Sequence, residues 1–269
     1  MNPREQLSLN RILSPQLPLP EFLKHAPHAD GVVLEARDLA KSFGGIKAVI
    51  ATSLAVGDRS LHALIGPNGA GKTTVFNLIT GFLRPSSGGI LLEGTRIVGL
   101  RPHAVTRRGV ARTFQVVKPF PKLSVRENVT LAAFSHEASR RRAEAQAAAT
   151  LERVGLGDRM DAAAADLTLG EQKRLEIARA LATKPKLLLL DEPMGGLNPR
   201  EVDAACELVR QIRADGVTVV LVEHVMKAIM RISDRIVVIH HGEKIADGPP
   251  DRVVQDPGVI AAYLGSRVA

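Results

Sequence analysis

The sequence has few of the residues expected of disulfide-bonded or membrane-spanning proteins. It contains one cysteine, Cys206, so no disulfide can form within the chain, which fits a reducing compartment such as the cytoplasm. The best apolar run, Lys186–Leu190 with four leucines, is far shorter than the roughly 20 residues needed to cross a bilayer. The first 21 residues lack an apolar core, so no signal peptide is expected.

Aromatic residues make up 3% of the chain, with no tryptophan and one tyrosine. This scarcity matters because the net charge of +8 would otherwise suggest a nucleic-acid partner. Proteins that hold single strands stack the bases on aromatic rings. The basic residues are mostly scattered, and a solvated face, an anionic membrane surface or an acidic partner explains them equally well. We therefore expect no nucleic-acid partner.

The chain divides into a proline-rich leader, 1–30, expected to be poorly ordered, and one globular domain at 31–265. Short apolar segments predict strands at Val32–Glu35, Ser53–Val56, Ser60–Ile65, Gly89–Glu93, Leu187–Asp191, Thr218–Glu223 and Arg235–His240. The last three are mostly apolar and suit a sheet covered on both faces.

The middle of the chain, about 116–182, has a helical composition. Ala132–Leu151 is rich in alanine, arginine and glutamate, and a second helix is predicted from about Gly170 to Leu181. We expect these helices to form an all-helical subdomain inserted into an α/β core.

A glycine-rich segment after a predicted strand carries the clearest chemical signal. It matches the pattern G-x-x-x-x-G-K-[ST] in full, which assigns nucleotide binding to Gly66, Pro67, Asn68, Gly69, Ala70, Gly71, Lys72, Thr73 and Thr74. The glycines let backbone N–H groups point at phosphate oxygens, aided by the N-terminus of the following helix. Lys72 is expected to reach the β- and γ-phosphates of ATP, and Thr73 to ligate Mg²⁺.

A second motif places two acidic residues at the end of the buried strand Leu187–Asp191. Asp191 is expected to complete the Mg²⁺ shell. Glu192, directly after it, is expected to orient and deprotonate the attacking water as general base. The alternative is that Asp191 and Glu192 are only a polar strand end without function. The phosphate loop upstream disfavours this alternative.

Five further positions match a known pattern, and with them the sequence resembles the ATP-binding cassette (ABC) family over roughly residues 31–265. The matching positions are the adenine-stacking aromatic Phe43, the Q-loop glutamine Gln115, the signature loop Leu167–Gln172, the D-loop Gly195–Asn198 and the switch histidine His224. The resemblance implies an α/β fold: a P-loop NTPase (RecA-like) core with an antiparallel β subdomain and the inserted helical subdomain. It also implies that Gln115 contacts Mg²⁺ or the attacking water and that His224 takes part in hydrolysis. Phe43 as a core residue and His224 as a plain strand-end histidine remain the alternatives.

The signature loop also has a physical interpretation. Thr168 and Glu171 have the spacing of a capping box, which predicts a helix whose N-terminus faces outward. A positive helix end beside Gly170 is suited to a γ-phosphate. In the family this phosphate belongs to ATP held by the opposite subunit, which implies two cassettes arranged head to tail. Leu169 stands where the motif usually has glycine.

Longer matches narrow the resemblance to the ATPase of bacterial branched-chain (hydrophobic) amino-acid importers. The segments that carry it are Gly66–Phe82, Arg112–Gln115, Arg174–Arg179, Gly196–Pro199, Glu223–Met226 and Ala262–Gly265. That family pairs two related ATPases with two integral-membrane permeases and a periplasmic binding protein, on the cytoplasmic face of the inner membrane. A soluble ABC ATPase acting on nucleic acid or ribosomes is the alternative, which the single cassette disfavours.

The segment Val116–Val125, directly after Gln115, places Phe120 and Leu123 beside prolines at 119 and 121. Such a segment cannot form a regular helix or central strand, so a surface loop with an apolar tip is expected. In the family a short cytoplasmic helix of the permease docks here. The alternative is that Phe120 and Leu123 pack within the helical subdomain.

Overall fold

The computed structural model describes residues 31–115 and 117–264. The expectation of a poorly ordered leader at 1–30, and the end of the domain at 265, lie outside these residues. Within them, no helix is long and apolar enough to cross a membrane.

A six-stranded sheet forms the centre of the molecule, in the order β10-β9-β3-β8-β7-β6. Its strands are β3 (Leu61–Ile65), β6 (Val110–Arg112), β7 (Leu187–Asp191), β8 (Thr218–Val222), β9 (Arg235–His240) and β10 (Glu243–Gly248). All neighbours pair in parallel except β10, which runs antiparallel to β9. The sheet confirms the predicted α/β core.

Both faces of this sheet are buried. Side chains along a strand alternate between the two faces, so one strand contributes to the packing on each side. In β7, Leu188 and Leu190 join the apolar cluster that continues into the helices above the sheet. Leu187 and Leu189 instead join the cluster shared with the antiparallel sheet. This explains why β7 is one uninterrupted apolar run.

A second sheet is antiparallel and four-stranded, in the order β2-β1-β4-β5. It consists of β1 (Val32–Phe43), β2 (Ile46–Gly57), β4 (Ser87–Leu92) and β5 (Thr95–Arg96). Helix α2 (Lys72–Ile79) buries Val75, Phe76 and Ile79 in the apolar cluster that links it with strands of both sheets. The sequence predicted only parts of β1 and β2, because register shifts and the left-handed residues Asp38 and Ala51 interrupt their alternation.

The remaining helices are α3 (Pro102–Arg107), α4 (Val125–Ala133), α5 (Arg140–Arg153), α6 (Leu169–Leu181), α7 (Pro199–Ala214), α8 (Met226–Ile232), α9 (Pro250–Val253) and α10 (Pro257–Leu264). The prediction of one continuous helix over Ala132–Leu151 is wrong. The chain leaves α4 at Ala133 and starts α5 after Ser139, its N-cap residue. Composition alone favours a helix here but does not locate this break.

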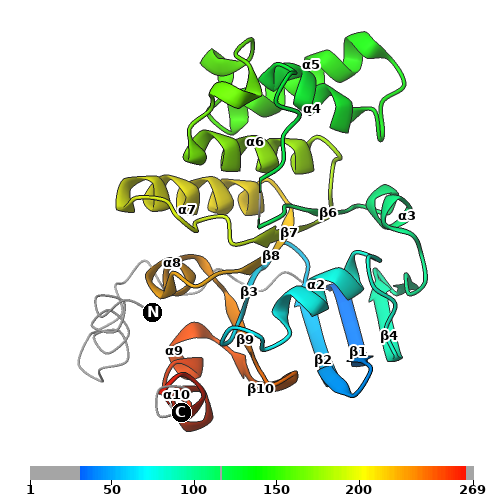
Figure 1. Ribbon diagram of the computed structural model, residues 1–269, viewed down its shortest axis with the longest axis vertical. Helices are drawn as coiled ribbons and strands as arrows, with labels where there is room; N and C mark the ends of the chain where they lie inside the picture. Colours follow the sequence, from blue (N-terminus) through cyan, green and yellow to red (C-terminus); the bar gives the residue numbers. More distant parts are fainter. Residues whose placement is uncertain (1–30, 116, 265–269) are drawn as a thin grey trace.

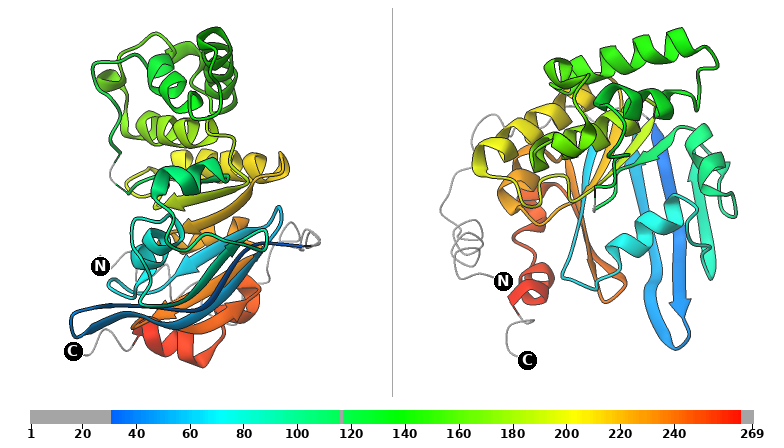
Figure 2. Two further views of the ribbon diagram at one scale, coloured as in Figure 1. Left: turned by 90° about the vertical axis from the view of Figure 1, so that its right-hand side faces the viewer. Right: turned by 45° about the horizontal axis from the view of Figure 1, so that its top comes forward.

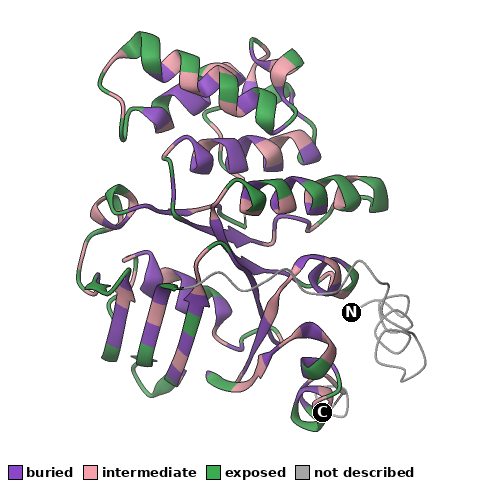
Figure 3. Cartoon of the chain, turned by 180° about the vertical axis from the view of Figure 1, so that it is seen from behind, coloured by how far each residue is buried: buried purple, intermediate pink, exposed green. Residues whose placement is uncertain are grey.

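Helices α4, α5 and α6 lie together above α7 and the six-stranded sheet, and α8, α9 and α10 lie beside β9 and β10 (Figure 1). The views of Figure 2 show the antiparallel sheet as a separate layer from these upper helices. Burial concentrates where the layers face one another (Figure 3). The helices fit the predicted inserted subdomain, whose limits at about 116 and 182 stay a prediction.

Candidate nucleotide-binding and hydrolysis site

The predicted site residues gather at one edge of the six-stranded sheet. Strands β3, β6, β7 and β8 run parallel, so their carboxyl ends meet at the same edge. The phosphate loop follows β3, the Q-loop segment follows β6, Glu192 follows β7, and His224 comes shortly after β8. The parallel topology thus brings together motifs that lie far apart in the sequence.

The phosphate loop needs glycine at its two ends. Gly66 has φ 152°, and a Cβ there would lie 1.9 Å from the carbonyl oxygen of Ile239. Gly71 has φ 108°, and its Cβ would lie 2.4 Å from the carbonyl oxygen of Ala48. Helix α2 starts directly after Gly71 without a side-chain cap, so its N-terminal N–H groups suit phosphate binding.

Lys72 is buried, and its ammonium lies over the loop. It donates to the carbonyl oxygens of Gly66 at 2.7 Å and Pro67 at 2.9 Å. Burial lowers the pKa of Lys72, while the nearby Glu192 and Asp191 raise it. The cation is therefore placed beside both acidic residues and the loop expected to hold the phosphates.

The three predicted metal ligands line one cavity of about 620 Å³. Thr73 contributes a hydroxyl from the first turn of α2, Asp191 a carboxylate from the end of β7, and Gln115 an amide. Few protein oxygens, with room left for water and phosphate, are what Mg²⁺ prefers. These residues fit a magnesium ion bound together with ATP.

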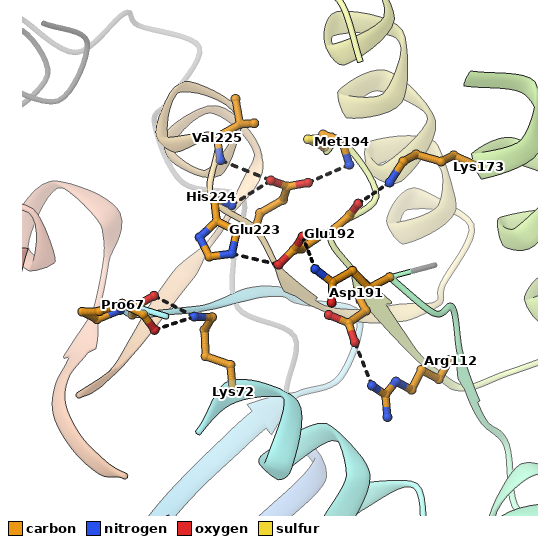
Figure 4. Close-up of polar contacts among 12 residues, drawn as sticks. Pro67, Lys72, Arg112, Lys173, Asp191, Glu192, Met194, Glu223, His224 and Val225 are labelled. Atoms are coloured by element: carbon orange, nitrogen blue, oxygen red, sulfur yellow. Dashed lines mark hydrogen bonds and ion pairs between the residues drawn. The ribbon is translucent and has the colours of Figure 1, made fainter. Parts of the chain in front are cut away.

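Glu192 contacts both of the other predicted catalytic residues, and Figure 4 shows its contact with His224. Gln115 Nε2 donates to Glu192 Oε2 at 2.9 Å, and His224 Nε2 lies 2.8 Å from Glu192 Oε1. Glu192 has φ 49°, a conformation that a non-glycine residue keeps only where its surroundings hold it. The structure thus brings Gln115, Glu192 and His224 into one hydrogen-bonded group, as a general base and its supports require.

Arg112 is a site residue that the sequence reasoning did not single out. Its guanidinium donates to Asp191 Oδ2 at 2.7 Å and to Asn77 Oδ1 at 2.6 Å. The guanidinium carbon lies 5.5 Å from the ring centroid of Phe76 and 5.3 Å from that of Phe114. Arg112 belongs to the matching segment Arg112–Gln115, but that match does not predict its ion pair with Asp191.

Two further buried charges, Lys173 and Glu223, surround Glu192. The Lys173 ammonium donates to the Glu192 carbonyl oxygen at 2.6 Å, and burial lowers the pKa of Lys173. Glu223 is 2% exposed and accepts main-chain N–H groups at the end of β8 and after Glu192. Lys173 directly follows the signature loop, and Glu223 opens the matching segment Glu223–Met226, but neither residue was assigned a role in the site from the sequence.

The signature segment forms the predicted capping box. Glu171 N donates to Thr168 Oγ1 at 3.3 Å, and Thr168 N donates to Glu171 Oε2 at 2.8 Å, at the start of α6. Thr168 and Leu169 are exposed, but Gly170 is buried. A Cβ at Gly170 would lie 2.9 Å from Glu201 Oε1. The helix end faces outward as predicted, although Gly170 itself packs against α7.

Phe43 lies at the turn between β1 and β2 and is 46% exposed, with the Lys41 ammonium 5.1 Å from its ring centroid. The alternative that Phe43 is a core residue is therefore wrong. Its stacking on adenine stays a prediction. In the same sheet, β2 passes beside the phosphate loop, where the carbonyl oxygen of Ala48 lies against Gly71.

Tyr263, the single tyrosine of the chain, reaches the phosphate loop from α10. It is largely buried, which raises the pKa of its hydroxyl to about 12, and a backbone group of Gly66 hydrogen-bonds to it. From the sequence, Tyr263 stood out only as the single tyrosine and as part of the terminal match Ala262–Gly265.

A phosphate loop, a buried lysine and paired acidic residues at the ends of parallel strands define a P-loop protein that binds and cleaves a nucleoside triphosphate. Comparisons with known proteins agree. The ABC transporter family model matches residues 50–195, and a model described as "Branched-chain amino acid ATP-binding cassette transporter" matches residues 243–269.

Similar proteins include the high-affinity branched-chain amino acid transport ATP-binding protein BraF of Pseudomonas aeruginosa, 44% identical over 87% of this chain and 98% of its own length. LivG of Escherichia coli, with the same description, is 43% identical over the same shares. An ATP-binding cassette of an ABC transporter solved in its ADP conformation is 30% identical with a TM-score of 0.80, covering 87% of this chain and 99% of that one. A cassette dimer bound to ADP and Pi after hydrolysis is 25% identical with a TM-score of 0.73, covering 81% and 98%.

The chain belongs to the ABC transporter family, among the ATP-binding proteins of the branched-chain amino-acid type. It is a nucleotide-binding ATPase of a transporter. The comparisons do not support the alternative of a soluble ABC ATPase acting on nucleic acid or ribosomes.

Proposed function

We propose that this ATPase powers an importer of branched-chain or related amino acids. The names of the similar proteins BraF and LivG support the substrate class. The observation that carries the chemistry is the Glu192 carboxylate held between Gln115 and His224 at the edge of the phosphate loop. Uptake of labelled leucine by vesicles containing the assembled transporter, dependent on ATP and on this chain, is the test. Uptake of an unrelated solute alone would contradict the substrate class.

In the proposed reaction the phosphate loop and Lys72 hold the triphosphate. Thr73, Asp191 and Gln115 would hold a Mg²⁺ ion, which would neutralise charge on the phosphates. Glu192 takes the proton from the water that attacks the γ-phosphorus, while the bond from this phosphorus to the β,γ-bridging oxygen breaks and ADP leaves. Gln115 and His224 keep the two carboxylate oxygens of Glu192 in place through their side-chain contacts.

The site is proposed to be completed by a second ABC ATPase, identical or homologous, arranged head to tail. Support comes from the exposed N-terminus of α6, where Thr168, Gly170 and Glu171 would meet the partner's γ-phosphate. The similar cassette that was solved as a dimer with ADP and Pi supports such a pairing. We place the assembly on the cytoplasmic face of the inner membrane, attached through two permease subunits, with a periplasmic binding protein delivering the substrate.

Two variants separate the two halves of such a shared site. Lys72→Ala removes a charged phosphate contact worth roughly 1.5–3 kcal/mol, so nucleotide affinity should fall roughly 10- to 10²-fold. Leu169→Asp places a negative charge at the exposed α6 end, so turnover should be lost while the isolated subunit binds nucleotide normally. Position 169 is chosen because a side chain at Gly170 would press on Glu201, which caps α7. Equal affinity losses in both variants, measured by titration with labelled nucleotide, would contradict a site shared between subunits.

A permease contact is proposed at the cavity beside Gln115. Three aromatic side chains near it, Phe82, Phe114 and Phe120, are 53%, 46% and 50% exposed. The rings of Phe82 and Phe114 meet edge to face at 5.9 Å, and Arg179, which lines the cavity, lies over the Phe120 ring at 5.4 Å. The described part of the segment before α4, residues 117–124, forms no helix, as predicted. Grouped exposed aromatics of this kind mark protein contacts.

Phe120→Asp should abolish co-purification with the permeases while the isolated subunit folds and binds ATP. The fold is expected to tolerate it because buried Asn128 holds the loop through the Phe120 main chain, at 2.8 Å to N and 3.1 Å to O. Surface changes of this kind usually alter stability by about 0.5 kcal/mol or less. Val32→Asp, at an exposed position that does not line the cavity, is the matched control. An unfolded Phe120→Asp subunit would favour the packing role instead.

A further inference from the structure

A buried carboxylate joins the two segments that carry Glu192 and His224. Glu223 Oε1 accepts the N–H of Met194 at 2.6 Å. Its other oxygen, Oε2, accepts the N–H groups of His224 at 2.8 Å and Val225 at 3.2 Å (Figure 4). A buried charge is costly unless it is hydrogen-bonded, and three N–H donors satisfy this one. The result is a link between the end of β8 and the segment after β7.

The main chain of Glu192 is held at two further points, by the end of β8 and by α6. Its N–H donates to the Val222 carbonyl oxygen at 2.9 Å, and its own carbonyl oxygen accepts the Lys173 ammonium at 2.6 Å. Met194, two residues further on, is the point that Glu223 holds. The left-handed backbone of Glu192 is therefore held at its own N–H and carbonyl groups and again two residues later, at Met194.

We propose that Glu223 is a positioning residue for ATP hydrolysis, which sets the relation of Glu192 to His224 by holding the main chain of both segments. The proposal rests on the roles proposed above for Glu192 and His224. Within the described residues, the hydrogen bonds of Glu223 go to these two segments and not to the phosphate loop. Glu223 therefore acts on turnover and not on nucleotide affinity.

The chemistry requires a carboxylate at this position. Glutamine has the same size but one acceptor oxygen, and its amide group would point a donor at a main-chain N–H. Glu223→Gln must therefore lose the contact to Met194 or the contacts to His224 and Val225. Aspartate keeps the charge and can still accept the N–H groups of the neighbouring His224 and Val225. Its side chain is one methylene shorter, so it would not also reach Met194.

The test measures ATP hydrolysis by the full chain assembled with its partner ATPase and permeases. For Glu223→Gln, kcat should fall roughly 10- to 10²-fold, the loss typical of a reacting group displaced by about 1 Å, with KM for ATP unchanged. Nucleotide affinity of the isolated subunit should also stay unchanged. Glu243→Gln, the same change at an exposed position of β10, should leave kcat intact. A normal kcat for Glu223→Gln, or a loss confined to KM, overturns the proposal.

A double-mutant cycle with His224→Ala separates positioning from general stabilisation of the fold. If Glu223 acts through His224, adding Glu223→Gln to His224→Ala should cost far less than it does alone. Full additivity overturns the proposal. If Glu223→Gln fails to fold, the cycle is run with Glu223→Asp and the same criteria apply. If His224→Ala alone leaves kcat unchanged, the role proposed for His224 fails first, and the positioning role fails with it.

Discussion

Glu192→Gln is expected to bind ATP normally and to hydrolyse it about 10²–10⁴ times more slowly, the usual cost of removing a general base. This loss corresponds to roughly 3–5 kcal/mol of activation barrier. The amide has nearly the same shape and can still meet Gln115 and His224, but it cannot accept the proton of the attacking water. Binding should survive because the phosphate loop and Lys72, not Glu192, are placed to hold the phosphates.

An ATP-bound dimer should therefore accumulate in this variant, which size-exclusion chromatography with labelled ATP can detect. Glu207→Gln is the matched control, because Glu207 is exposed on α7 and lies outside the group around Glu192. Turnover close to the wild-type rate in the assembled transporter would refute the assignment of Glu192. Another residue would then have to take the proton.

Much of the site was predictable because its motifs are short and local. The phosphate loop, Asp191 and Glu192 each follow a strand, and a parallel sheet brings such strand ends to one edge. The capping box at Thr168 was predictable for the same reason, since it depends on residues three apart. Local motifs are therefore enough to predict which residues the parallel sheet brings together at this edge.

The supporting contacts were not predictable, because they join positions far apart in the chain. Arg112 lies 79 residues from Asp191, and Met194 lies 29 residues from Glu223. Burial of Gly170 against Glu201 could not be predicted either, because it depends on how α6 packs on α7. The same limit applies to β1, where Asp38 breaks the alternation that identifies a strand.

Arg112→Ala is expected to destabilise the fold strongly, because it leaves the carboxylate of Asp191 buried without its partner. The side chains of Arg112 and Asp191 are 6% and 3% exposed, and breaking such a pair typically costs about 3–5 kcal/mol. For a domain of this size, that loss lowers Tm by roughly 6–20 °C. Arg126→Ala is the control, because its pair with Asp161 is 38% and 87% exposed and should contribute about 0–1 kcal/mol.

The cause of this destabilisation can be tested with a second change at the partner. Asp191→Asn removes the charge that Arg112→Ala would strand, so the double variant should unfold at a higher temperature than the sum of the single effects predicts. Both variants are measured by thermal unfolding without nucleotide, which keeps the loss of magnesium binding out of the comparison. Additive losses would show that Arg112 stabilises the fold through Asn77 and the rings of Phe76 and Phe114, and not by neutralising Asp191.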